Sequence, residues 1–209
     1  MKGEYMNKVT FYFDFVSPYS YLAQTQIAEL AEQTKSSIEY VPVFLAGLHK
    51  LQKVTSPAFI PSKAQWIIRD CHMWADQYQL PLKWSANFPF NSIALLRTCL
   101  WLQQSSPSEV AVFVDKTFKA IWEHELDVSN MIDVSNHLQA MGLDPEEVLQ
   151  GTGLPNVKQA LKDNGDLAAK KEMFGLPVFE VSNKLYFGQD RLHFVKQALM
   201  GKPLNDGPR

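Results

Sequence analysis

Hydrophobic and polar positions follow a strand–helix–strand pattern at the start of the chain. Residues 9–15 form a run dense in aromatic and β-branched side chains, which is typical of a buried strand. Residues 19–32 repeat apolar positions with a helical period, and residues 37–44 return to the partial alternation of a strand. A helix between two such strands predicts a right-handed βαβ unit with parallel strands.

From about residue 57 to about residue 151 the spacing of apolar residues is helical. It predicts helices over residues 63–79, 91–104, 109–122, 131–141 and 145–150, with Pro or Gly at nearly every boundary. A further helix over residues 156–174 precedes a hairpin over residues 177–187, whose turn falls at Ser182 and Asn183. Asp190 is then a candidate N-cap for a last helix over residues 191–200.

The order of these elements predicts a fold. A βαβ unit and an αββα unit separated by a block of helices give an α/β thioredoxin-like fold with an all-helical insertion. We expect residues 1–52 and 154–209 to form the thioredoxin-like domain and residues 53–153 to form the helical insertion domain.

Composition and charge exclude several classes of function. The 209 residues are 46% hydrophobic and 20% charged, as in globular domains, and the formal net charge of −2 without a basic run argues against nucleic acid as a partner. No apolar run is long enough to span a membrane, and the first residues lack an apolar signal-peptide core, so a cytoplasmic location is expected. Cys71 and Cys99, far apart in helical segments, predict two buried reduced thiols.

Ser17 is the leading candidate for chemistry because it lies at the turn between the first strand and the first helix. A helix start offers unpaired N–H groups and a positive dipole potential, which together favour an anion. In a thioredoxin-type layout a redox enzyme has Cys-x-x-Cys at this turn, whereas this chain has Ser17-Pro18-Tyr19-Ser20, so dithiol exchange there is excluded. The hydroxyl could instead stabilise a thiolate and lower the thiol pKa from about 8.5, or Ser17 could simply cap the helix.

Three further positions could contact a ligand, and each also has a structural explanation. A cis Leu176–Pro177 bond would turn the Leu176 backbone outward to pair with an extended ligand. A trans proline is permitted at a strand start and is far more common, and only the thioredoxin-like arrangement favours the cis form. Asp190 could hold an ammonium group or only cap a helix. Lys63 at a helix start opposes the helix dipole, so it serves either a ligand carboxylate or simply solvent.

The aromatic residues and the histidines were also candidates for a site. Trp66, Trp84 and Phe88 could line an aromatic pocket facing Ser17, or they could belong to the core of the helical insertion. The histidines show no metal-ligand spacing, so no metal site is predicted; they are His49, His72, His124, His137 and His193.

Four blocks of the sequence carry a resemblance to a known family. They read FYFDFVSPYSYLA, PSKAQWIIRDCHMWADQYQLPLKW, FPFNSIALLR and FGLPVFEVSNKLYFGQDRLHFVKQAL, and they extend over most of residues 9–199. Their order and spacing resemble the 2-hydroxychromene-2-carboxylate isomerases, which are relatives of the kappa-class glutathione transferases within the DsbA-like branch of the thioredoxin superfamily.

The resemblance implies glutathione as cofactor, a small aromatic acid as substrate and a homodimer. Ser17 matches the serine that hydrogen-bonds the glutathione sulfur, and Lys63 matches the lysine that pairs with a glutathione carboxylate. Leu176 matches the residue before the family's cis-proline, here Pro177, and the backbone of that residue pairs with the cysteinyl part of glutathione. The residues that match the pair near the γ-glutamyl end are Asp190 and Arg191.

The same resemblance suggests a substrate pocket and shows departures from the family pattern. The substrate pocket is expected to include Tyr19 together with the aromatic residues Trp66, Trp84 and Phe88. Family members often carry Asn shortly before the proline that matches Pro57, and Thr55 could replace it here. Trp66 stands where a Tyr is common.

The sequence therefore predicts a glutathione-dependent isomerase of this type, with other functions left open. A kappa-like glutathione transferase or peroxidase, or a non-catalytic glutathione-binding protein, would use the same site. A DsbA-like disulfide oxidoreductase conflicts with the missing cysteines at residues 17–20, and a serine hydrolase lacks a Gly-x-Ser-x-Gly motif.

Overall fold

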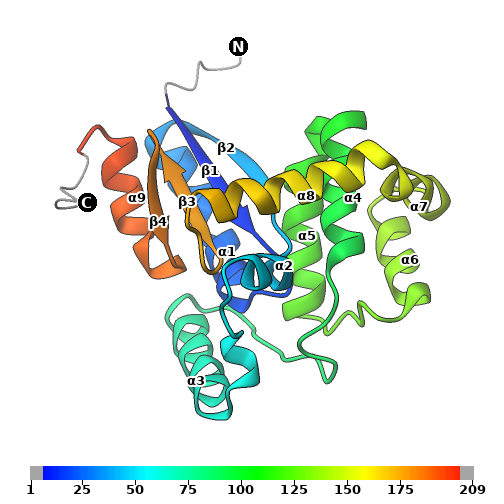
Figure 1. Ribbon diagram of the computed structural model, residues 1–209, viewed down its shortest axis with the longest axis horizontal. Helices are drawn as coiled ribbons and strands as arrows, with labels where there is room; N and C mark the ends of the chain where they lie inside the picture. Colours follow the sequence, from blue (N-terminus) through cyan, green and yellow to red (C-terminus); the bar gives the residue numbers. More distant parts are fainter. Residues whose placement is uncertain (1–6, 203–209) are drawn as a thin grey trace.

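The computed structural model describes residues 7–202. A four-stranded mixed sheet lies at the centre of the fold (Figure 1). Its strand order is β2-β1-β3-β4. β1 (Asn7–Phe13) runs parallel to β2 (Ser36–Pro42), and α1 (Pro18–Thr34) connects them. β3 (Val178–Val181) pairs antiparallel with both β1 and β4 (Lys184–Phe187). The predicted βαβ unit and hairpin are both confirmed.

Each face of the sheet packs against its own helices because successive side chains of a strand point to opposite faces. Phe11 and Phe13 of β1 join the larger hydrophobic cluster with residues of α1 and α9 (Leu192–Leu199). Phe11 stacks on Phe13 and on Phe179, with ring centroids 5.3 and 5.2 Å away. Tyr12 belongs to a second cluster that contains residues of α2 (Leu45–Leu51) and α8 (Pro155–Lys170). The aromatic residues of β1 thus hold both layers of helices.

The helices that follow α2 in the sequence lie in two places. A block beside the sheet consists of α4 (Ile93–Ser105), α5 (Val110–Trp122), α6 (Met131–Ala140) and α7 (Pro145–Gly153), whereas α3 (Pro61–Gln77) lies apart from them (Figure 1). Short 3₁₀ turns precede α3 and α5. The indole N–H of Trp122 donates to the Phe15 carbonyl at 3.0 Å, so this block is joined to the turn after β1. The thioredoxin-like fold with a helical insertion is confirmed. The domain boundaries stay a prediction. Residues 1–6 and 203–209, which the predicted thioredoxin-like domain includes, lie outside the described residues.

Two local predictions were wrong, and one helix was not predicted. The helix α2 was not predicted, and α8 ends at Lys170 rather than at residue 174 because the chain turns at Glu172, whose φ is 60°. Asp190 does not cap the last helix. It lies within a 3₁₀ turn, Gln189–Arg191, and its carboxylate pairs with the Arg191 guanidinium, while Arg191 occupies the N-cap position of α9.

Two predictions from composition can be compared with the structure. Cys71 and Cys99 are both buried free thiols. Within residues 7–202, no helix combines the length and apolar character needed to cross a membrane.

Two helical glycines have opposite surroundings and give a matched test of the packing. A Cβ built on Gly151 of α7 would lie 2.4 Å from the indole of Trp101 on α4, whereas a Cβ on Gly165 of α8 would meet nothing within 4 Å. We expect Gly151→Ala to lower the free energy of unfolding by about 1–3 kcal/mol through overpacking. Gly165→Ala should raise it by about 1 kcal/mol, because Ala has the better helix propensity. Urea denaturation of both variants measures these changes, and an equal effect at the two sites would contradict the packing of α7 on α4.

Candidate functional site

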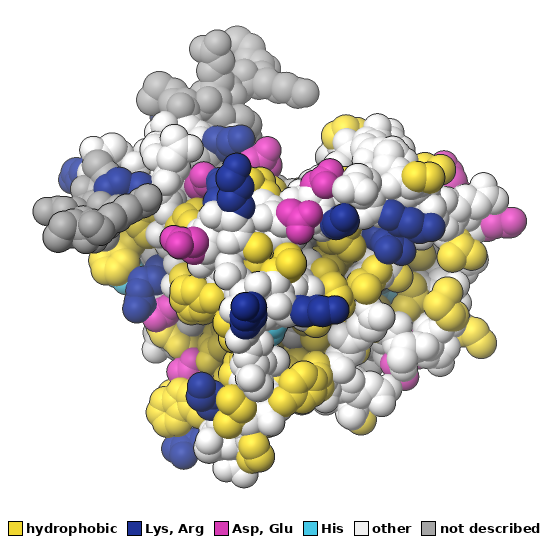
Figure 2. All heavy atoms as spheres, viewed as in Figure 1, with side chains coloured by type: hydrophobic (Ala, Val, Ile, Leu, Met, Phe, Trp, Pro, Cys, Tyr) yellow, Lys and Arg dark blue, Asp and Glu magenta, His cyan; other side chains and the backbone are white. Residues whose placement is uncertain are grey.

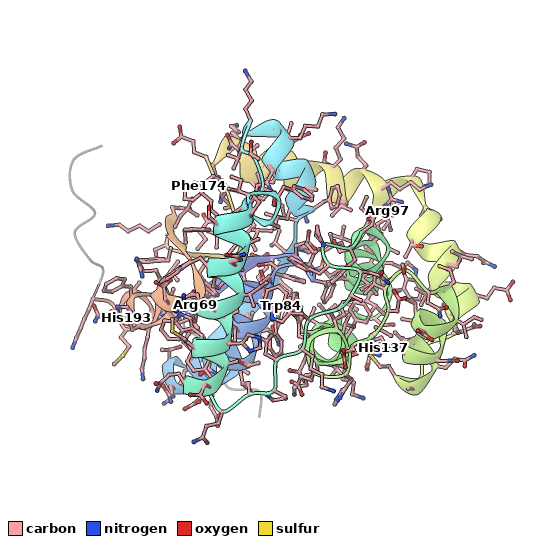
Figure 3. The ribbon with its side chains drawn as sticks, turned by 90° about the horizontal axis from the view of Figure 1, so that it is seen from below. Arg69, Trp84, Arg97, His137, Phe174 and His193 are labelled. Carbon is pink, nitrogen blue, oxygen red and sulfur yellow. The ribbon has the colours of Figure 1, made fainter. Side chains whose placement is uncertain are left out.

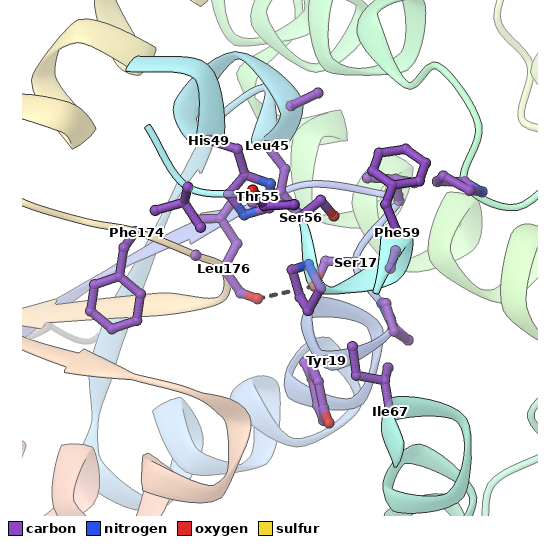
Figure 4. Close-up of a pocket in the computed structure, with 18 of the residues that line it drawn as sticks. Ser17, Tyr19, Leu45, His49, Thr55, Ser56, Phe59, Ile67, Phe174 and Leu176 are labelled. Carbon is purple, nitrogen blue, oxygen red and sulfur yellow. Dashed lines mark hydrogen bonds between the residues drawn. The ribbon is translucent and has the colours of Figure 1, made fainter. Parts of the chain in front are cut away.

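The turn after β1 places Ser17 at the start of α1. Ser17 is the N-cap of this helix, with an extended backbone and with Pro18 as the first helical residue. Its hydroxyl accepts from the Ser20 backbone N–H at 3.1 Å and donates to the Leu176 carbonyl at 3.1 Å (Figure 4). Ser17 therefore caps the helix, and it also lines a pocket beside the chain segment that leads into β3.

Leu176 reaches Ser17 because the segment before β3 crosses beside the start of α1. The Leu176–Pro177 peptide bond is cis, the alternative that the thioredoxin-like arrangement favoured. Leu176 lines the pocket, whereas the Pro177 carbonyl accepts from the Gly188 backbone N–H at 3.0 Å. A second cis bond, Phe88–Pro89, lies in the pocket wall and was not predicted.

Asp14 lies beneath this turn and is fully buried. One carboxylate oxygen accepts from the Val16 N–H at 3.2 Å, and the other accepts from the Leu45 N–H at 2.7 Å. Burial raises the pKa of Asp14 to about 6, although hydrogen bonds to its carboxylate oppose that shift. Asp14 was not predicted from the sequence as a residue of the site. The signal available was a carboxylate at the end of an aromatic strand, where a charge needs partners.

The helix α2 forms one wall of the pocket. Leu45 and His49, one helical turn apart, both line it, and Lys50 and Thr55 follow along the same stretch of chain (Figure 4). His49 is buried, and burial lowers its pKa, so its imidazole is neutral at pH 7. His49 was not predicted to line a pocket, because the helix α2 that carries it was not predicted.

The helix α3 forms the opposite wall. Lys63 and Ile67, one turn apart, line the pocket, and the Tyr19 hydroxyl of α1 donates to the Asp70 carboxylate of α3 at 2.8 Å. This hydrogen bond joins the two helices that carry Ser17 and Lys63. Burial, together with the nearby acidic groups, raises the pKa of Tyr19, so its phenol stays protonated at pH 7.

The pocket between these walls has a volume of about 850 Å³, which is large enough for a tripeptide and a small aromatic molecule. Six phenylalanine side chains line it: Phe44, Phe59, Phe88, Phe90, Phe174 and Phe187. Lys50 and Lys63 are its cations, and no Asp or Glu among the described residues lines it. A pocket with this lining favours a ligand that is partly apolar and carries negative charge.

Six of the predicted site residues come together at this pocket, and five do not line it. Ser17, Tyr19, Thr55, Lys63, Phe88 and Leu176 all line it. Pro177, Asp190 and Arg191 do not, and the last two pair with each other.

The two predicted tryptophans lie away from the pocket lining. Trp66 does not line the pocket, although Lys63 and Ile67 of the same helix do, and its side chain is 59% exposed. Trp84 instead packs edge-on against Trp122 and Phe88, with ring centroids 5.4 and 5.1 Å away, in the packed middle of the molecule (Figure 3). The structure therefore favours the interpretation of Trp84 as a core residue of the helical insertion over its interpretation as a pocket residue.

The chemistry available to this pocket is limited by where the cysteines are. Neither Cys71 nor Cys99 lines it, and burial raises the pKa of both thiols. A reactive sulfur at Ser17 would therefore have to come with a ligand.

Comparison with known protein families agrees with this geometry. A family model described as the DSBA-like thioredoxin domain matches residues 8–200. The chain belongs to this family.

Named relatives of this DSBA-like chain are of two kinds. The 2-hydroxychromene-2-carboxylate isomerase of Sphingobium xenophagum is 27% identical over 198 residues, covering 92% of this chain and 97% of that enzyme. Glutathione S-transferase kappa 1 of Caenorhabditis elegans is 24% identical over 212 residues, covering 95% and 94%. A solved structure of 2-hydroxychromene-2-carboxylate isomerase superposes with a TM-score of 0.82 at 24% identity, covering 93% of this chain and 95% of that one.

The raised pKa of Asp14 predicts a pH dependence of stability in this DSBA-like protein. A carboxyl group whose pKa is about 6 when folded and about 4 when unfolded stabilises the fold fully below pH 4 and loses that contribution as pH rises through 6. The loss amounts to about 3 kcal/mol, since each pKa unit is worth about 1.4 kcal/mol.

We expect the stability difference between wild type and Asp14→Asn to shrink by about this amount between pH 4 and pH 7. Urea denaturation across this pH range measures it. Asp76→Asn, which removes a carboxylate from an exposed site on α3, should show no comparable change. A constant difference between wild type and Asp14→Asn would contradict the raised pKa.

Proposed function

We propose that this protein is a glutathione-dependent isomerase of the 2-hydroxychromene-2-carboxylate isomerase type that acts on a small unsaturated aromatic acid. The observation that carries the proposal is the Ser17 hydroxyl at the start of α1, lining a pocket to which the chain contributes no cysteine. The relatives named as 2-hydroxychromene-2-carboxylate isomerases, which cover nearly the whole chain, support the same reaction.

The residues of the pocket fit most of glutathione. Ser17 offers a hydroxyl to the sulfur, Lys63 offers a cation to a carboxylate, and the Leu176 backbone lies beside Ser17. Thr55 also lines the pocket and could hold the peptide part. The ammonium group is the part that the lining does not match, because the carboxylate expected there, Asp190, pairs with Arg191 and does not line the pocket.

Glutathione, when bound, would supply a thiolate that adds reversibly to an unsaturated substrate: a sulfur–carbon bond would form as one carbon–carbon double bond becomes single and its electron pair moves to the conjugated carbonyl, and after rotation the pair would return and release the thiolate. The role of Ser17 is to donate a hydrogen bond from its hydroxyl to that sulfur, supported by the dipole of α1, and so to favour the charged form near neutral pH. The role of Lys63 is to orient the peptide. The phenylalanine rings exclude water and receive a flat aromatic substrate.

Removing the Ser17 hydroxyl tests this role. A hydrogen bond to a charged group contributes about 1.5–3 kcal/mol, so Ser17→Ala should raise the pKa of the bound glutathione thiol by about one to two units. Ultraviolet absorbance of the thiolate, followed as a function of pH, measures that pKa. Ser17→Thr keeps a hydroxyl and should retain a lowered pKa.

Ser20→Ala is the matched control on the same helix. The Ser20 hydroxyl is buried and has no hydrogen-bond partner within the described residues, and Ser20 does not line the pocket. The variant should leave the pKa of the bound thiol unchanged. An unchanged pKa in Ser17→Ala, or no glutathione binding by wild-type protein in calorimetry, would refute the proposal.

A kappa-like glutathione transferase is the second candidate, because glutathione transferases named kappa are almost as similar to this chain as the isomerases. The two functions differ in the fate of the sulfur–carbon bond. Chromatography of reaction mixtures distinguishes them, because a transferase accumulates a glutathione conjugate whereas an isomerase returns free glutathione. Glutathione binding with neither outcome across a panel of unsaturated aromatic acids would favour a non-catalytic binding protein.

We also propose that the protein is a cytoplasmic homodimer. Exposed apolar side chains on α3 and on the turn before it favour association, among them Phe59, Trp66 and Met73, which are 70%, 59% and 57% exposed. Figure 2 shows hydrophobic side chains gathered on the part of the surface where α3 lies. Light scattering at micromolar concentration should give twice the mass of one chain, and a monomer would contradict this prediction.

A further inference from the structure

His49 is a polar group of the pocket that the proposed function leaves without a role. It lines the pocket, yet only 8% of its surface is exposed. No other described residue makes a hydrogen bond with its imidazole. By contrast, the half-buried ring of His137 has a partner, since its Nε2 lies 3.1 Å from the Thr117 hydroxyl. Because the imidazole lines the pocket and has no hydrogen-bond partner among the described residues, a ligand held there can replace water as its partner.

The position of His49 is fixed by hydrogen bonds at both ends of α2. At the start of the helix, the Leu45 N–H donates to the buried Asp14 carboxylate at 2.7 Å. At its end, the Gln52 side-chain amide donates to the Ala169 carbonyl of α8 at 2.8 Å, and the Val54 N–H donates to the His49 carbonyl at 2.9 Å. The imidazole is therefore held against the pocket rather than in solvent, as Figure 4 shows.

The surroundings of His49 favour a negatively charged acceptor. Burial keeps the imidazole neutral, so it carries one N–H donor and one acceptor nitrogen. Lys50 and Lys63 also line the pocket, and no carboxylate of the described residues does. A carboxylate in this pocket would accept a hydrogen bond from the imidazole N–H, and the two lysines give the lining a positive charge that favours an anion.

We propose that His49 binds the ligand directly, by donating a hydrogen bond from its imidazole to a carboxylate oxygen of the molecule held in the pocket. The inference rests on the proposed function for the identity of that molecule. Glutathione and an aromatic acid both carry a carboxylate, and the experiment below separates these two sources.

Calorimetry with matched pairs of ligands tests this contact. The first pair is glutathione and its diethyl ester, in which both carboxylates are masked. The second pair is cinnamate and cinnamamide, a planar aromatic acid and its neutral counterpart. Loss of a hydrogen bond to a carboxylate should weaken binding about tenfold or more, so His49→Phe should weaken one acid by that factor and leave its neutral counterpart unchanged.

Two further variants separate hydrogen bonding from packing. His49→Gln keeps an N–H donor and should bind the acid within about threefold of wild type. His72→Phe makes the same substitution at an exposed site on α3 that does not line the pocket, and it should bind all four ligands as wild type does. If His49→Phe fails to fold, the ¹⁵N resonances of His49 in wild-type protein replace it, and they should shift with the acid but not with its neutral counterpart.

The outcomes distinguish this inference from the proposed function. A loss for glutathione but not for its ester assigns the contact to glutathione, and a loss for cinnamate but not for cinnamamide assigns it to the aromatic acid. An equal loss for an acid and its neutral counterpart, or no loss for either pair, overturns the inference. Should wild-type protein fail to bind glutathione, the proposed function fails, while an acid-specific loss for cinnamate would still support His49.

Discussion

The buried carboxylate of Asp14 is the interaction on which the pocket depends. Its two oxygens bind the N–H groups of Val16 and Leu45, so one side chain joins the end of β1, the turn before Ser17 and the start of α2. The N-cap residue of α2, Phe44, provides no side-chain hydrogen bond, so Asp14 satisfies an N–H group of that helix from another part of the chain. A negative charge at a helix start is favourable, which offsets part of the cost of burying it.

The same constraint sets which groups face the ligand. Because Asp14 fixes the turn, Ser17 begins α1 beside Leu176, and because it fixes α2, His49 faces the pocket one turn after Leu45. The cysteines are excluded from this arrangement, since Cys71 and Cys99 are buried in helices where the thiolate is unfavourable. The chain thus provides a hydroxyl, a neutral imidazole and two lysines around a pocket that lacks a sulfur of its own.

The sequence predicted those parts of the fold whose signals are local. Strand and helix periodicities located the sheet and the long helices, and Pro18 marked the start of α1. The helix α2 was missed because it has only seven residues and its starting signal, Asp14, lies 31 positions earlier. For the site, the family resemblance that includes the motif around Ser17 also indicated Lys63 and Leu176, and both line the pocket. Trp66 could not be placed from the sequence, because membership of the pocket depends on how α3 is rotated about its axis.

The hydrogen bonds of Ser17 suggest how a single hydroxyl could select the charged form of a sulfur. Its one proton goes to the Leu176 carbonyl, while its oxygen accepts from the Ser20 N–H. A neutral thiol would offer the hydroxyl a weaker acceptor than this carbonyl, so the proton would stay where it is. A thiolate accepts a charge-assisted hydrogen bond, which is about twice as strong as a neutral one, so the hydroxyl would turn toward it. The competition with Leu176 thereby sharpens the dependence of the Ser17 contribution on ionisation of the ligand, because a neutral thiol would gain little from a hydroxyl that already has a good acceptor.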